Sequence, residues 1–566
     1  MRRGLVLSRF RWNLRPPVPE GHPLRNGLPP LLGQLVYNRG LSEPAQVKSF
    51  LAGDAGLAGD PFLLPDMPQA VSRLYRALLS GETIAIFGDY DTDGATSTAL
   101  LTLGLSRLGA VVIPYIPNRF TEGYGLTSAA LERLAAQGVS LVITVDCGIT
   151  SLAEIKGAGK MGLDVIVTDH HTPLAELPPA LAVVNPRLST SVYPFPELAG
   201  VGVACKLLQA LLRSLGREES LEELADLAAL GTIADLSPLV GENRYLVKKG
   251  LKLLNGRPRP GLKELMTQCG LSAGEIDAEK IAWVIAPCLN AAGRLEHALT
   301  SYKLLTTDSA GEAAALARQL CDINTERQKM TADTFARARE RVMRQAVAEI
   351  IFSADPANHI GITGLVAGRL CEEFYRPSFV IRTGEEMSTG SARSIPEFNV
   401  VNALGECAHL LSRFGGHSQA AGFTVPTSNL EELERSLTRL AGERLAGIDL
   451  RPALDIDRQL SLNLLAGDTY RTIRSLAPFG RGNPCPVFLS RGVETLECAS
   501  MGNGQEHLRF KLKQDGIIWD GVGFRLGNYL GEAAGRLDIV YNLEVDSWGG
   551  VERLRLNVLD FQAAVV

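Results

Sequence analysis

Three aspartates stand at alternating positions directly after an apolar run. The segment IFGDYDTDG, residues 86–94, contains Asp89, Asp91 and Asp93 and ends at Gly94. Carboxylates packed this closely repel one another, so a folded chain must either hold a cation among them or leave them fully in water. The spacing therefore raises the question of a metal site.

Polar residues also end two further predicted strands. LVITV runs into Asp146, and DVIVT runs into Asp169, His170 and His171. In a parallel sheet these positions are all carboxyl ends of strands, and they lie along the one edge where open α/β sheets bind ligands. Carboxylate oxygens with imidazole suit Mn²⁺, with Mg²⁺ as a substitute. So many carboxylates favour two ions that share a bridging aspartate. Two ions about 4 Å apart clamp the attacking and leaving oxygens of a phosphoryl displacement.

Each of these motifs alone has a simpler interpretation. DYDTDG also matches the start of an EF-hand calcium loop, but that loop needs a Glu at its twelfth position and a helix before it. Here the twelfth position is Leu100, and a strand precedes. An aspartate after a strand, such as Asp146, is usually a helix N-cap, and paired histidines are often surface residues. The joint placement at three strand ends favours the metal site.

The elements that position these residues alternate between helix and strand. From residue 66, short β-branched strands such as TIAIF and LVITVD are separated by helical stretches of ten to fifteen residues. This alternation predicts a parallel sheet with helices on both faces. We expect the parts in this order: an N-terminal arm and extension over 1–65, a catalytic α/β domain over 66–307, a connecting helix over 308–345, a second α/β domain over 346–448 and a strand-rich domain over 449–566.

Composition describes an ordinary globular protein without a general attraction for nucleic acid. The 566 residues include 46% hydrophobic and 21% charged residues, and the net charge is −5, so a nucleic-acid contact must come from a local groove. Nine cysteines are present. They are scattered without CxxC pairs, which fits a reducing cytoplasm and argues against a disulfide framework or a zinc knuckle. No apolar run reaches the length of a membrane span.

The acidic motifs resemble those of the DHH phosphoesterase superfamily. FGDYDTDG, VDCG and TDHH match its motifs, and the later segments resemble, in order, the RecJ family of bacterial single-strand-specific 5′→3′ DNA exonucleases. These later segments are IPNRFTEGYGL, LAGVGVACKLL, LGTIADLSPLVGENR, LNAAGR, GSARS, RFGGHSQAAGF and LAPFGRGNPCPVF. The resemblance covers nearly the whole chain. It implies an α/β fold, with a DHH parallel-sheet domain joined by a long helix to a DHHA1 α/β domain, followed by a C-terminal β-barrel of the OB-fold type.

The resemblance also implies a ligand set for two metal ions. Asp91 and Asp146 would hold one ion, and Asp93, Asp146, His170 and Asp235 would hold the other, so that Asp146 bridges. Asp89 occupies the first acidic position of the motif, where it would either contact an ion directly or hold a residue that does.

Two further positions of the motifs have roles without being ligands. His171 would face the scissile phosphate, and Asp169 would orient a neighbouring imidazole. Pyrophosphatase relatives have a histidine at the position of Phe87, a departure that bears on the first ion.

Phosphate-binding residues follow from the same resemblance. Arginine is suited to this role because its fork matches phosphate oxygens. The resemblance implies phosphate contacts from eight residues in all: Arg119, Arg294, Gln328, Arg369, Ser391, Arg393, Gly416 and His417. Gln328 and Arg369 are the weaker members of this set. Taken singly, each arginine is also compatible with an ordinary solvated surface position.

The C-terminal part gives an independent argument from periodicity. In HLRFKLKQDG, basic residues alternate with apolar ones, which places Arg509, Lys511 and Lys513 on one face of a strand. Asp515-Gly516 predicts a hairpin turn into IIWDGVGF. A small barrel with a basic exposed face is how OB-folds follow single strands. The alternative is an edge strand protected by lysines.

Together these features predict a cytoplasmic, monomeric, metal-dependent exonuclease. The resemblance implies that it releases 5′-mononucleotides from single-stranded DNA in recombination and repair, beside a helicase and single-strand-binding protein. Two alternatives remain. One is a small-substrate DHH enzyme for short oligoribonucleotides or cyclic dinucleotides, against which the domain after residue 450 argues. The other is a non-catalytic scaffold, against which the intact acidic and histidine positions argue.

Overall fold

The computed structural model describes residues 8–344, 348–465, 467–502, 504–546 and 553–564. The chain divides into two compact units, each with its own sheets. The first unit consists of residues 59–237 and 246–450, and the second of residues 1–58, 238–245 and 451–566. The predicted boundary at residues 345 and 346 lies outside the described residues.

The first unit contains the predicted parallel sheet. Its five strands run in the order β3-β2-β4-β5-β6, and every neighbouring pair is parallel. The strands are β2 (Thr83–Gly88), β3 (Val111–Tyr115), β4 (Val139–Val145), β5 (Asp164–Thr168) and β6 (Ala182–Val184). The three central strands are apolar and almost fully buried, which is the pattern of a sheet covered on both faces.

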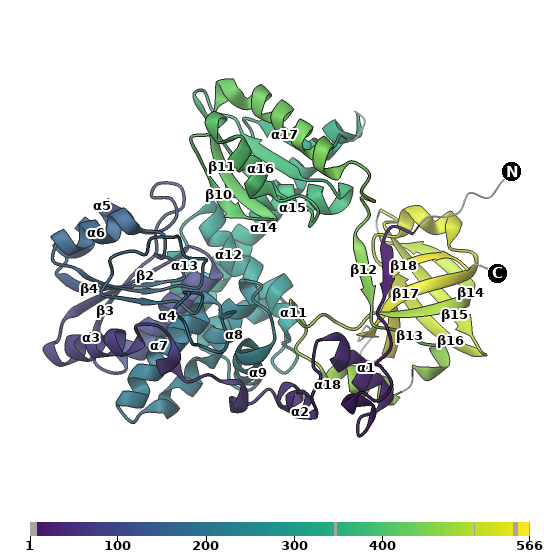
Figure 1. Cartoon of the computed structure of the whole chain (residues 1–566), viewed down its shortest axis with the longest axis horizontal. Helices are drawn as coiled ribbons and strands as arrows, with labels where there is room; N and C mark the ends of the chain where they lie inside the picture. Colours follow the sequence, from purple (N-terminus) through teal and green to yellow (C-terminus); the bar gives the residue numbers. More distant parts are fainter. Residues whose placement is uncertain (1–7, 345–347, 466, 503, 547–552, 565–566) are drawn as a thin grey trace. The chain divides into compact units, whose positions relative to one another are not determined.

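Helices cover both faces of this sheet, as predicted (Figure 1). Two of them, α5 (Ser128–Ala136) and α6 (Leu152–Lys160), pack their apolar residues against Phe87 and Val142. The other face meets α3 (Met67–Ser80), α4 (Thr92–Ser106) and α7 (Gly200–Ser214), with α8 (Ala225–Ala234) packed on α4 and α7.

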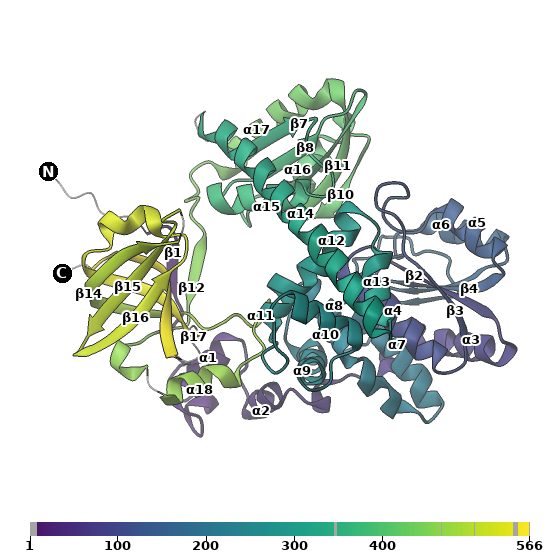
Figure 2. The same cartoon turned by 180° about the vertical axis from the view of Figure 1, so that it is seen from behind.

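A helical region and one long helix follow. The region comprises α9 (Gly241–Gly256), α10 (Pro260–Gln268), α11 (Ala278–Lys280), a π-helical turn (Ile281–Ile285), α12 (Ala286–Leu295) and α13 (Leu299–Thr306). The long helix, α14 (Ala310–Met343), has 34 residues (Figure 2) and spans roughly 50 Å. Its buried stripe includes Ala313, Ala317, Leu320 and Ile323, at the three- and four-residue spacing of an amphipathic helix.

The rest of the first unit is the second α/β domain. Its five strands run in the order β10-β11-β9-β8-β7; only the β7–β8 pair is parallel. The elements are β7 (Ile351–Asp355), α15 (Thr363–Phe374), β8 (Ser378–Arg382), β9 (Met387–Arg393), α16 (Val400–Glu406), β10 (Arg413–His417), β11 (Ala420–Pro426) and α17 (Leu430–Leu445). Their core contains Phe379, Phe423 and Leu437.

The second unit contains a closed β-barrel. Its strands run in the order β13-β14-β15-β16-β18-β17, and a β14–β17 pairing closes the ring. They are β13 (Arg458–Gln459), β14 (Phe488–Met501), β15 (His507–Gln514), β16 (Ile517–Gly523), β17 (Gly535–Asp546) and β18 (Arg553–Ala563), with α18 (Gly467–Ser475) beside them. Asp515 and Gly516 both have positive φ, 49° and 81°, and form the predicted two-residue hairpin turn.

The N-terminal segment belongs to the barrel unit. Its strand β1 (Arg11–Leu14) pairs in parallel with β12 (Ala453–Ile456), and Trp12 Nε1 donates to Asp560 Oδ2 at 2.8 Å. The helices α1 (Pro30–Asn38) and α2 (Pro44–Ala52) add Leu35 and Phe50 to the barrel's core. The sequence predicts this segment as an N-terminal arm and extension. The strand pairing and the helix packing attach it to the barrel.

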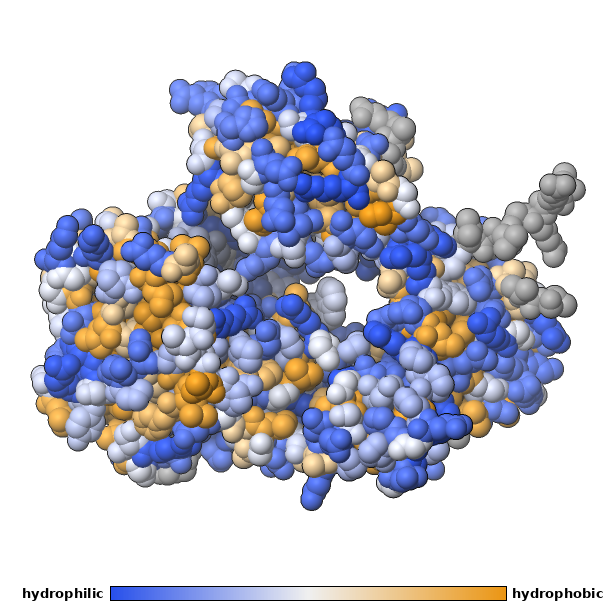
Figure 3. Space-filling model, viewed as in Figure 1, coloured by the Kyte–Doolittle hydropathy of each residue, from blue (hydrophilic) through white to orange (hydrophobic). Residues whose placement is uncertain are grey.

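Short 3-10 turns complete the chain: Pro23–Arg25, Ala55–Leu57, Pro61–Leu63, Glu218–Leu224, Ala408–Leu410, Thr427–Asn429, Leu462–Leu464 and Gly527–Glu532. Figure 3 shows one face of the molecule, on which hydrophobic residues are interspersed among hydrophilic ones. Among the described helices, none combines the length and apolar character needed to cross a membrane.

Candidate active site

The sequence-predicted acidic and histidine residues meet at the carboxyl edge of the parallel sheet. Asp89 follows β2, Asp146 follows β4, and Asp169 and His170 follow β5, and these three strands are neighbours. Ligand atoms lie within 4.8 Å of one another in three overlapping groups: Asp89, Asp91 and Asp146; Asp93, His170 and Asp235; and Asp146, His170 and His171. We call these seven residues the acidic cluster.

Hydrogen bonds and a tight turn fix the positions of the aspartates in the loop after β2. Asp91 caps α4, and its Oδ1 accepts the backbone N–H of Gly94 at 3.0 Å. A Cβ on Gly94 would lie 2.3 Å from the carbonyl oxygen of Asp89, so only glycine permits this close turn. Asp93 Oδ2 and Oδ1 accept the N–H groups of Gly200 and Val201, at 2.7 and 2.8 Å. The N-terminus of α7 therefore fixes the Asp93 carboxylate.

Asp146 adopts an unusual backbone conformation. Its φ is 59°, in the left-handed region that non-glycine residues rarely occupy and that clusters at functional sites. A Cβ on Gly200 would lie 2.6 Å from the Cβ of Asp146. The first residue of α7 must therefore be small for Asp146 to hold its place.

Asp169 lies behind the histidines. Its Oδ1 accepts the N–H groups of His170 and His171, at 2.7 and 3.0 Å, and lies 2.8 Å from His171 Nδ1; its Oδ2 accepts the N–H of Ile149 at 3.0 Å. Burial has the largest single effect and raises the pKa of Asp169, but the hydrogen bond and charge of His171 together with the backbone N–H bonds outweigh it, so the pKa is lowered. Burial would lower the pKa of His171, yet the same bond raises it to about 9. At neutral pH, His171 is a cation oriented by Asp169.

At four other carboxyls of the acidic cluster, burial outweighs the groups that favour ionisation. Burial first, and then repulsion from neighbouring carboxylates, raises the pKa of Asp89, Asp93 and Asp146 well above 3.8. Burial also raises the pKa of Asp235, and burial lowers that of His170. A cation among these groups would remove the repulsion that these shifts express.

The acidic cluster also contains buried polar atoms without partners. Among the described residues, none hydrogen-bonds to Asp89 Oδ1, Asp146 Oδ1, or either ring nitrogen of His170. His170 Nε2 lies only 3.0 Å from Asp146 Oδ1, but the geometry is not that of a hydrogen bond. Buried polar atoms are almost always satisfied. Oxygen and imidazole ligand atoms left unsatisfied within one cluster fit a divalent ion such as Mn²⁺ or Mg²⁺.

Two positions in and beside the acidic cluster need separate comment. Asp235 follows α8, and Ser237 Oγ donates to its Oδ2 at 2.6 Å; because it ends a helix, the strand-end argument alone does not find it. Phe87, at the position of a histidine in pyrophosphatase relatives, is fully buried and stacks on Tyr115 with ring centroids 5.0 Å apart. It cannot supply a ligand atom.

Arginines gather next to the acidic cluster. Burial first, and then the nearby Arg119, Arg327 and Arg393, lower the pKa of Arg294 to about 10. None of these four has an ion-pair partner among the described residues, and Arg119 instead lies over the ring of Tyr90, 5.0 Å from its centroid. Unpaired guanidinium groups in electrostatic contact form a site for anions such as phosphates.

The second α/β domain contributes the other predicted phosphate contacts. Ser391 Oγ lies 2.9 Å from Thr363 Oγ1, and Arg294 Nη1 donates to the carbonyl of Gly361 at 3.4 Å. His171 and Arg187 reinforce the lowering of the pKa of His417 that burial begins.

The effect of His171 on His417 shows that the second α/β domain lies within electrostatic reach of the acidic cluster. Gly416 precedes His417 on β10 with φ of 141°, and both are exposed. Gln328 and Arg369 are exposed on α14 and α15. After burial, the charge of Arg369 is the next cause that lowers the pKa of Arg327.

Two residues beside the acidic cluster escape the sequence analysis. Arg327 immediately precedes the predicted Gln328 and is the member of that pair that faces the arginines. Tyr124 lies between Gly123 and Gly125, and its ring contacts that of His171 edge-on, with centroids 6.4 Å apart. The glycines have φ of 84° and 81°, so the GYG pattern was the available signal for a tightly placed tyrosine.

The predicted basic face of the barrel is only partly free of acids. Along β15, Leu508, Phe510 and Leu512 are buried, while Arg509 and Lys511 are exposed and Lys513 is half-buried, so the predicted alternation is confirmed. Glu497 stands opposite Lys511, with Nζ and Oε2 3.9 Å apart, and Glu494 opposite Lys513. Arg509 stands opposite Ala499. The face is basic at Arg509 and mixed farther along.

Comparison with known proteins agrees with this architecture. The chain matches the family models of the DHH family N-terminal domain over residues 83–232, the DHHA1 domain over 345–443 and the RecJ OB domain over 456–560. The fold and its acidic edge thus define a phosphoesterase of the DHH class.

Individual relatives identify the family within the DHH class. The single-stranded-DNA-specific exonuclease RecJ of Bacillus subtilis is 37% identical over 564 residues, which is 98% of this chain and 71% of that protein. The crystal structure of RecJ from Thermus thermophilus with Mn²⁺ has a TM-score of 0.85 at 33% identity, covering 99% of this chain and 80% of that one. The structure of the same protein with Mg²⁺ has a TM-score of 0.79 at 32% identity, covering 99% and 79%. The chain belongs to the RecJ family.

Proposed function

We propose that this chain is a metal-dependent exonuclease that removes 5′-mononucleotides from single-stranded DNA in the 5′→3′ direction, in DNA recombination and repair. The observation that carries the proposal is the acidic cluster, in which Asp89 Oδ1, Asp146 Oδ1 and both ring nitrogens of His170 lack hydrogen-bond partners among the described residues. Beside it lie four arginines without ion pairs in the same part of the chain. Family membership supports it, because the curated relatives are named single-stranded-DNA-specific exonucleases. The mutual repulsion of the carboxylates suits a site for metal ions, and the positive charge of the arginines beside them suits the binding of a phosphate chain.

Two divalent ions fit the donor set, Mn²⁺ preferentially and Mg²⁺ as a substitute. Asp91 and Asp146, with Asp89, would hold one; Asp93, Asp146, His170 and Asp235 would hold the other. The ligand atoms of Asp89, Asp91 and Asp146 lie within 4.8 Å of one another, as do those of Asp93, His170 and Asp235. Each Asp93 oxygen that accepts a backbone N–H keeps a second lone pair for an ion.

The ions, when bound, would neutralise charge on the phosphate and lower the pKa of a water molecule that attacks the phosphorus in line. The chain's own residues do the rest. Arg119, Arg294 and Arg393 would bind phosphate oxygens, which orients the 5′ end. His171, held as a cation by Asp169, has Nε2 available for a hydrogen bond to the scissile phosphate. Ser391, Gly416 and His417 would hold the adjacent nucleotides, with Gln328 and Arg369 farther out.

Selection for single strands would follow from the close approach of the second α/β domain. A Cβ on Gly361 would lie 1.9 Å from the carbonyl oxygen of Arg294, so the two domains meet directly beside the arginines. A single strand can pass where a wider duplex cannot. If a blunt duplex were degraded as fast as the matching single strand, this part of the proposal would fail.

Digestion of strands labelled at either terminus tests the direction and the product. A 5′ label should appear at once as mononucleotide in the presence of Mn²⁺, while a 3′ label shortens one nucleotide at a time. Early release of the 3′ label would reverse the proposed polarity. A dinucleotide cut faster than a long strand would favour the small-substrate alternative instead. Function as a monomer, beside a helicase and single-strand-binding protein in the cytoplasm, stays a prediction from the resemblance.

A further inference from the structure

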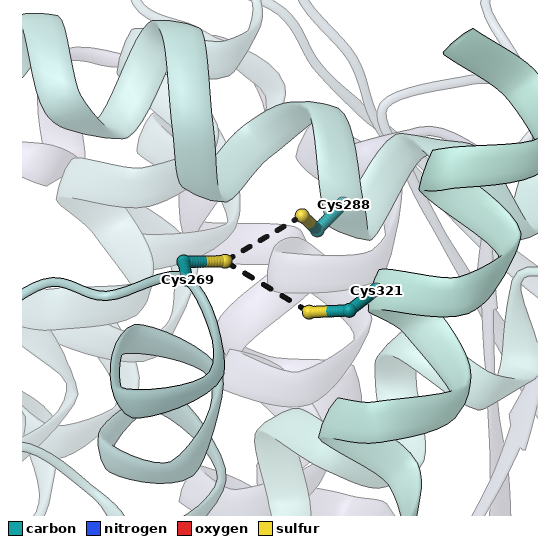
Figure 4. A group of neighbouring side chains, drawn as sticks. All are labelled: Cys269, Cys288 and Cys321. Atoms are coloured by element: carbon teal, nitrogen blue, oxygen red, sulfur yellow. Dashed lines mark hydrogen bonds between the residues drawn. The ribbon is translucent and has the colours of Figure 1, made fainter. Parts of the chain in front are cut away.

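Three cysteines from separate helical segments meet in the first unit. Cys269 directly follows α10, Cys288 lies in α12, and Cys321 lies in α14. The Sγ atom of Cys269 is 3.8 Å from that of Cys288 and 3.9 Å from that of Cys321, and all three sulfurs lie within 4.8 Å of one another. Figure 4 shows the three side chains pointing toward one another, with Cys269 joined to each of the others.

We propose that Cys269, Cys288 and Cys321 form a second metal site, distinct from the acidic cluster, which binds one soft ion of the Zn²⁺ type through three thiolates. Two sulfurs bonded to one tetrahedral Zn²⁺ at about 2.3 Å lie about 3.8 Å apart. The observed separations of 3.8 and 3.9 Å match this spacing. A disulfide, with an S–S bond of about 2.05 Å, would require one pair to move together and would leave the third thiol unused.

The surroundings of the sulfurs also suit thiolate ligands. Asn324 Nδ2 donates to Cys288 Sγ at 3.3 Å, and Asn324 Oδ1 accepts from Arg327 Nε at 3.0 Å, which fixes the amide so that its N–H points at sulfur. Such outer hydrogen bonds orient ligands and stabilise their charge. The hydrogen bond with Cys288, and to a smaller extent that with Cys321, lowers the pKa of Cys269 to about 7. The bond with Cys269 and burial raise the pKa of Cys288, and burial raises that of Cys321 to about 11, so a metal ion must displace the protons of these two thiols.

An ion could reach the three cysteines from solvent. Cys269 and Cys321 are half-buried, whereas Cys288 is 3% exposed. No further His, Cys, Asp or Glu of the described chain joins this group, so the fourth position of a tetrahedral ion would be left to water. Binding would displace the thiol protons and is therefore coupled to pH.

A bound ion would also join the helices that carry active-site residues. It would connect the end of α10 to α12 and α14. In α12, Asn290 Oδ1 accepts the N–H of Thr92 at 2.9 Å, beside Asp91 and Asp93, and Arg294 lies near the end of the same helix. We therefore expect zinc to raise the melting temperature of the full chain.

Cobalt substitution tests the site with a signal that the acidic cluster cannot produce. The full chain, stripped of metal under reducing conditions, is titrated with Co²⁺. Carboxylate and imidazole ligands give no sulfur-to-cobalt charge-transfer band, but thiolates do. We expect one equivalent of Co²⁺ to produce this band, and one equivalent of Zn²⁺ to remove it.

Variants identify the ligands. Cys288→Ala should abolish the band. Cys321→Ser, at a half-buried position that tolerates a polar side chain, should weaken it severely and serves if the first variant fails to fold. Cys371→Ala is the matched control: this cysteine is also buried but lies in α15, outside the group of three, and its removal should leave the band intact.

Three results would overturn the proposal. The first is the absence of the band while three reactive thiols remain titratable. The second is a band that survives in both Cys288→Ala and Cys321→Ser. The third is a Cys269–Cys288 disulfide, detected by mass spectrometry, as the resting state of protein purified with zinc.

Discussion

The acidic cluster and the three-cysteine site hold their ligand atoms at similar distances but differ in the kind of ligand atom. In each, the ligand atoms of a group lie within 4.8 Å of one another, but the first offers carboxylates and imidazole, and the second offers only sulfur. Hard oxygen donors favour Mn²⁺ and Mg²⁺, and thiolates favour Zn²⁺ and other soft ions. The two proposals therefore assign different ions to the two sites, Mn²⁺ or Mg²⁺ for the reaction at the acidic cluster and Zn²⁺ for holding helices together at the cysteines.

Removing the shared aspartate of the acidic cluster should have the largest effect. Asp146→Asn keeps the size of the side chain, and asparagine tolerates the left-handed backbone at this position. We expect kcat to fall by roughly 10³-fold or more, because charge compensation at the phosphate is lost. Steady-state release of mononucleotides in Mn²⁺ measures this. The same variant should retain the cobalt–thiolate band; losing both would show that the two sites are not independent.

The arginines beside the acidic cluster come next. Arg294→Ala should lower kcat/KM by about 10- to 100-fold, the cost of losing hydrogen bonds to a charged group. Arg294→Lys should recover only part of it, because lysine lacks the fork. Arg439→Ala, on the exposed side of α17 where Arg439 pairs with Glu443 at 2.8 Å, is the control and should be unchanged. Equal losses in Arg294→Ala and Arg439→Ala would argue against a phosphate contact.

Charge loss on the barrel should have a smaller effect. Arg509→Ala with Lys513→Ala should weaken binding of a long single strand by about 3- to 10-fold and reduce the dependence on salt. Cleavage of a short oligonucleotide that cannot reach the barrel should not change. The pair Lys156→Ala and Lys160→Ala, exposed on α6, removes equal charge elsewhere. Fluorescence anisotropy at several salt concentrations would separate the two, and identical behaviour would favour the edge-protection role of the lysines.

Stability against pH offers the smallest and most general test of the acidic cluster. Burial and mutual repulsion raise the pKa of Asp89, Asp93 and Asp146 above 3.8. Above pH 4, the folded carboxyls therefore keep protons that the unfolded chain has lost, so the free energy of unfolding falls as pH rises. We expect the melting temperature in chelator to fall as pH rises above about 4, where the unfolded carboxyls ionise. Mn²⁺ should flatten the curve; a rise with pH in chelator would contradict the account.

The sequence predicts the acidic cluster because its geometry follows from local patterns. Short apolar strands alternating with helices define a parallel sheet, and the residues after β2, β4 and β5 must then share an edge. Asp89, Asp146 and His170 follow directly. Asp235 does not, because the end of a helix carries no such rule, and the family resemblance was needed to propose it.

The three-cysteine site could not be predicted in the same way. Cys269, Cys288 and Cys321 are separated by long stretches of chain, and no spacing rule joins them. Their contact depends on how α10 and α12 pack on α14, and helix packing angles are set by side-chain fit rather than by periodicity. The pairing of β1 with β12 was also not predicted, because a strand of four residues gives little sign of its partner.

Anomalous scattering from crystals grown with Mn²⁺ tests the central claim most directly. The account predicts two peaks within the acidic cluster, with Asp146 touching both, and no manganese at Cys269, Cys288 and Cys321. An empty cluster, with Asp91, Asp146 and His170 turned apart, would contradict it.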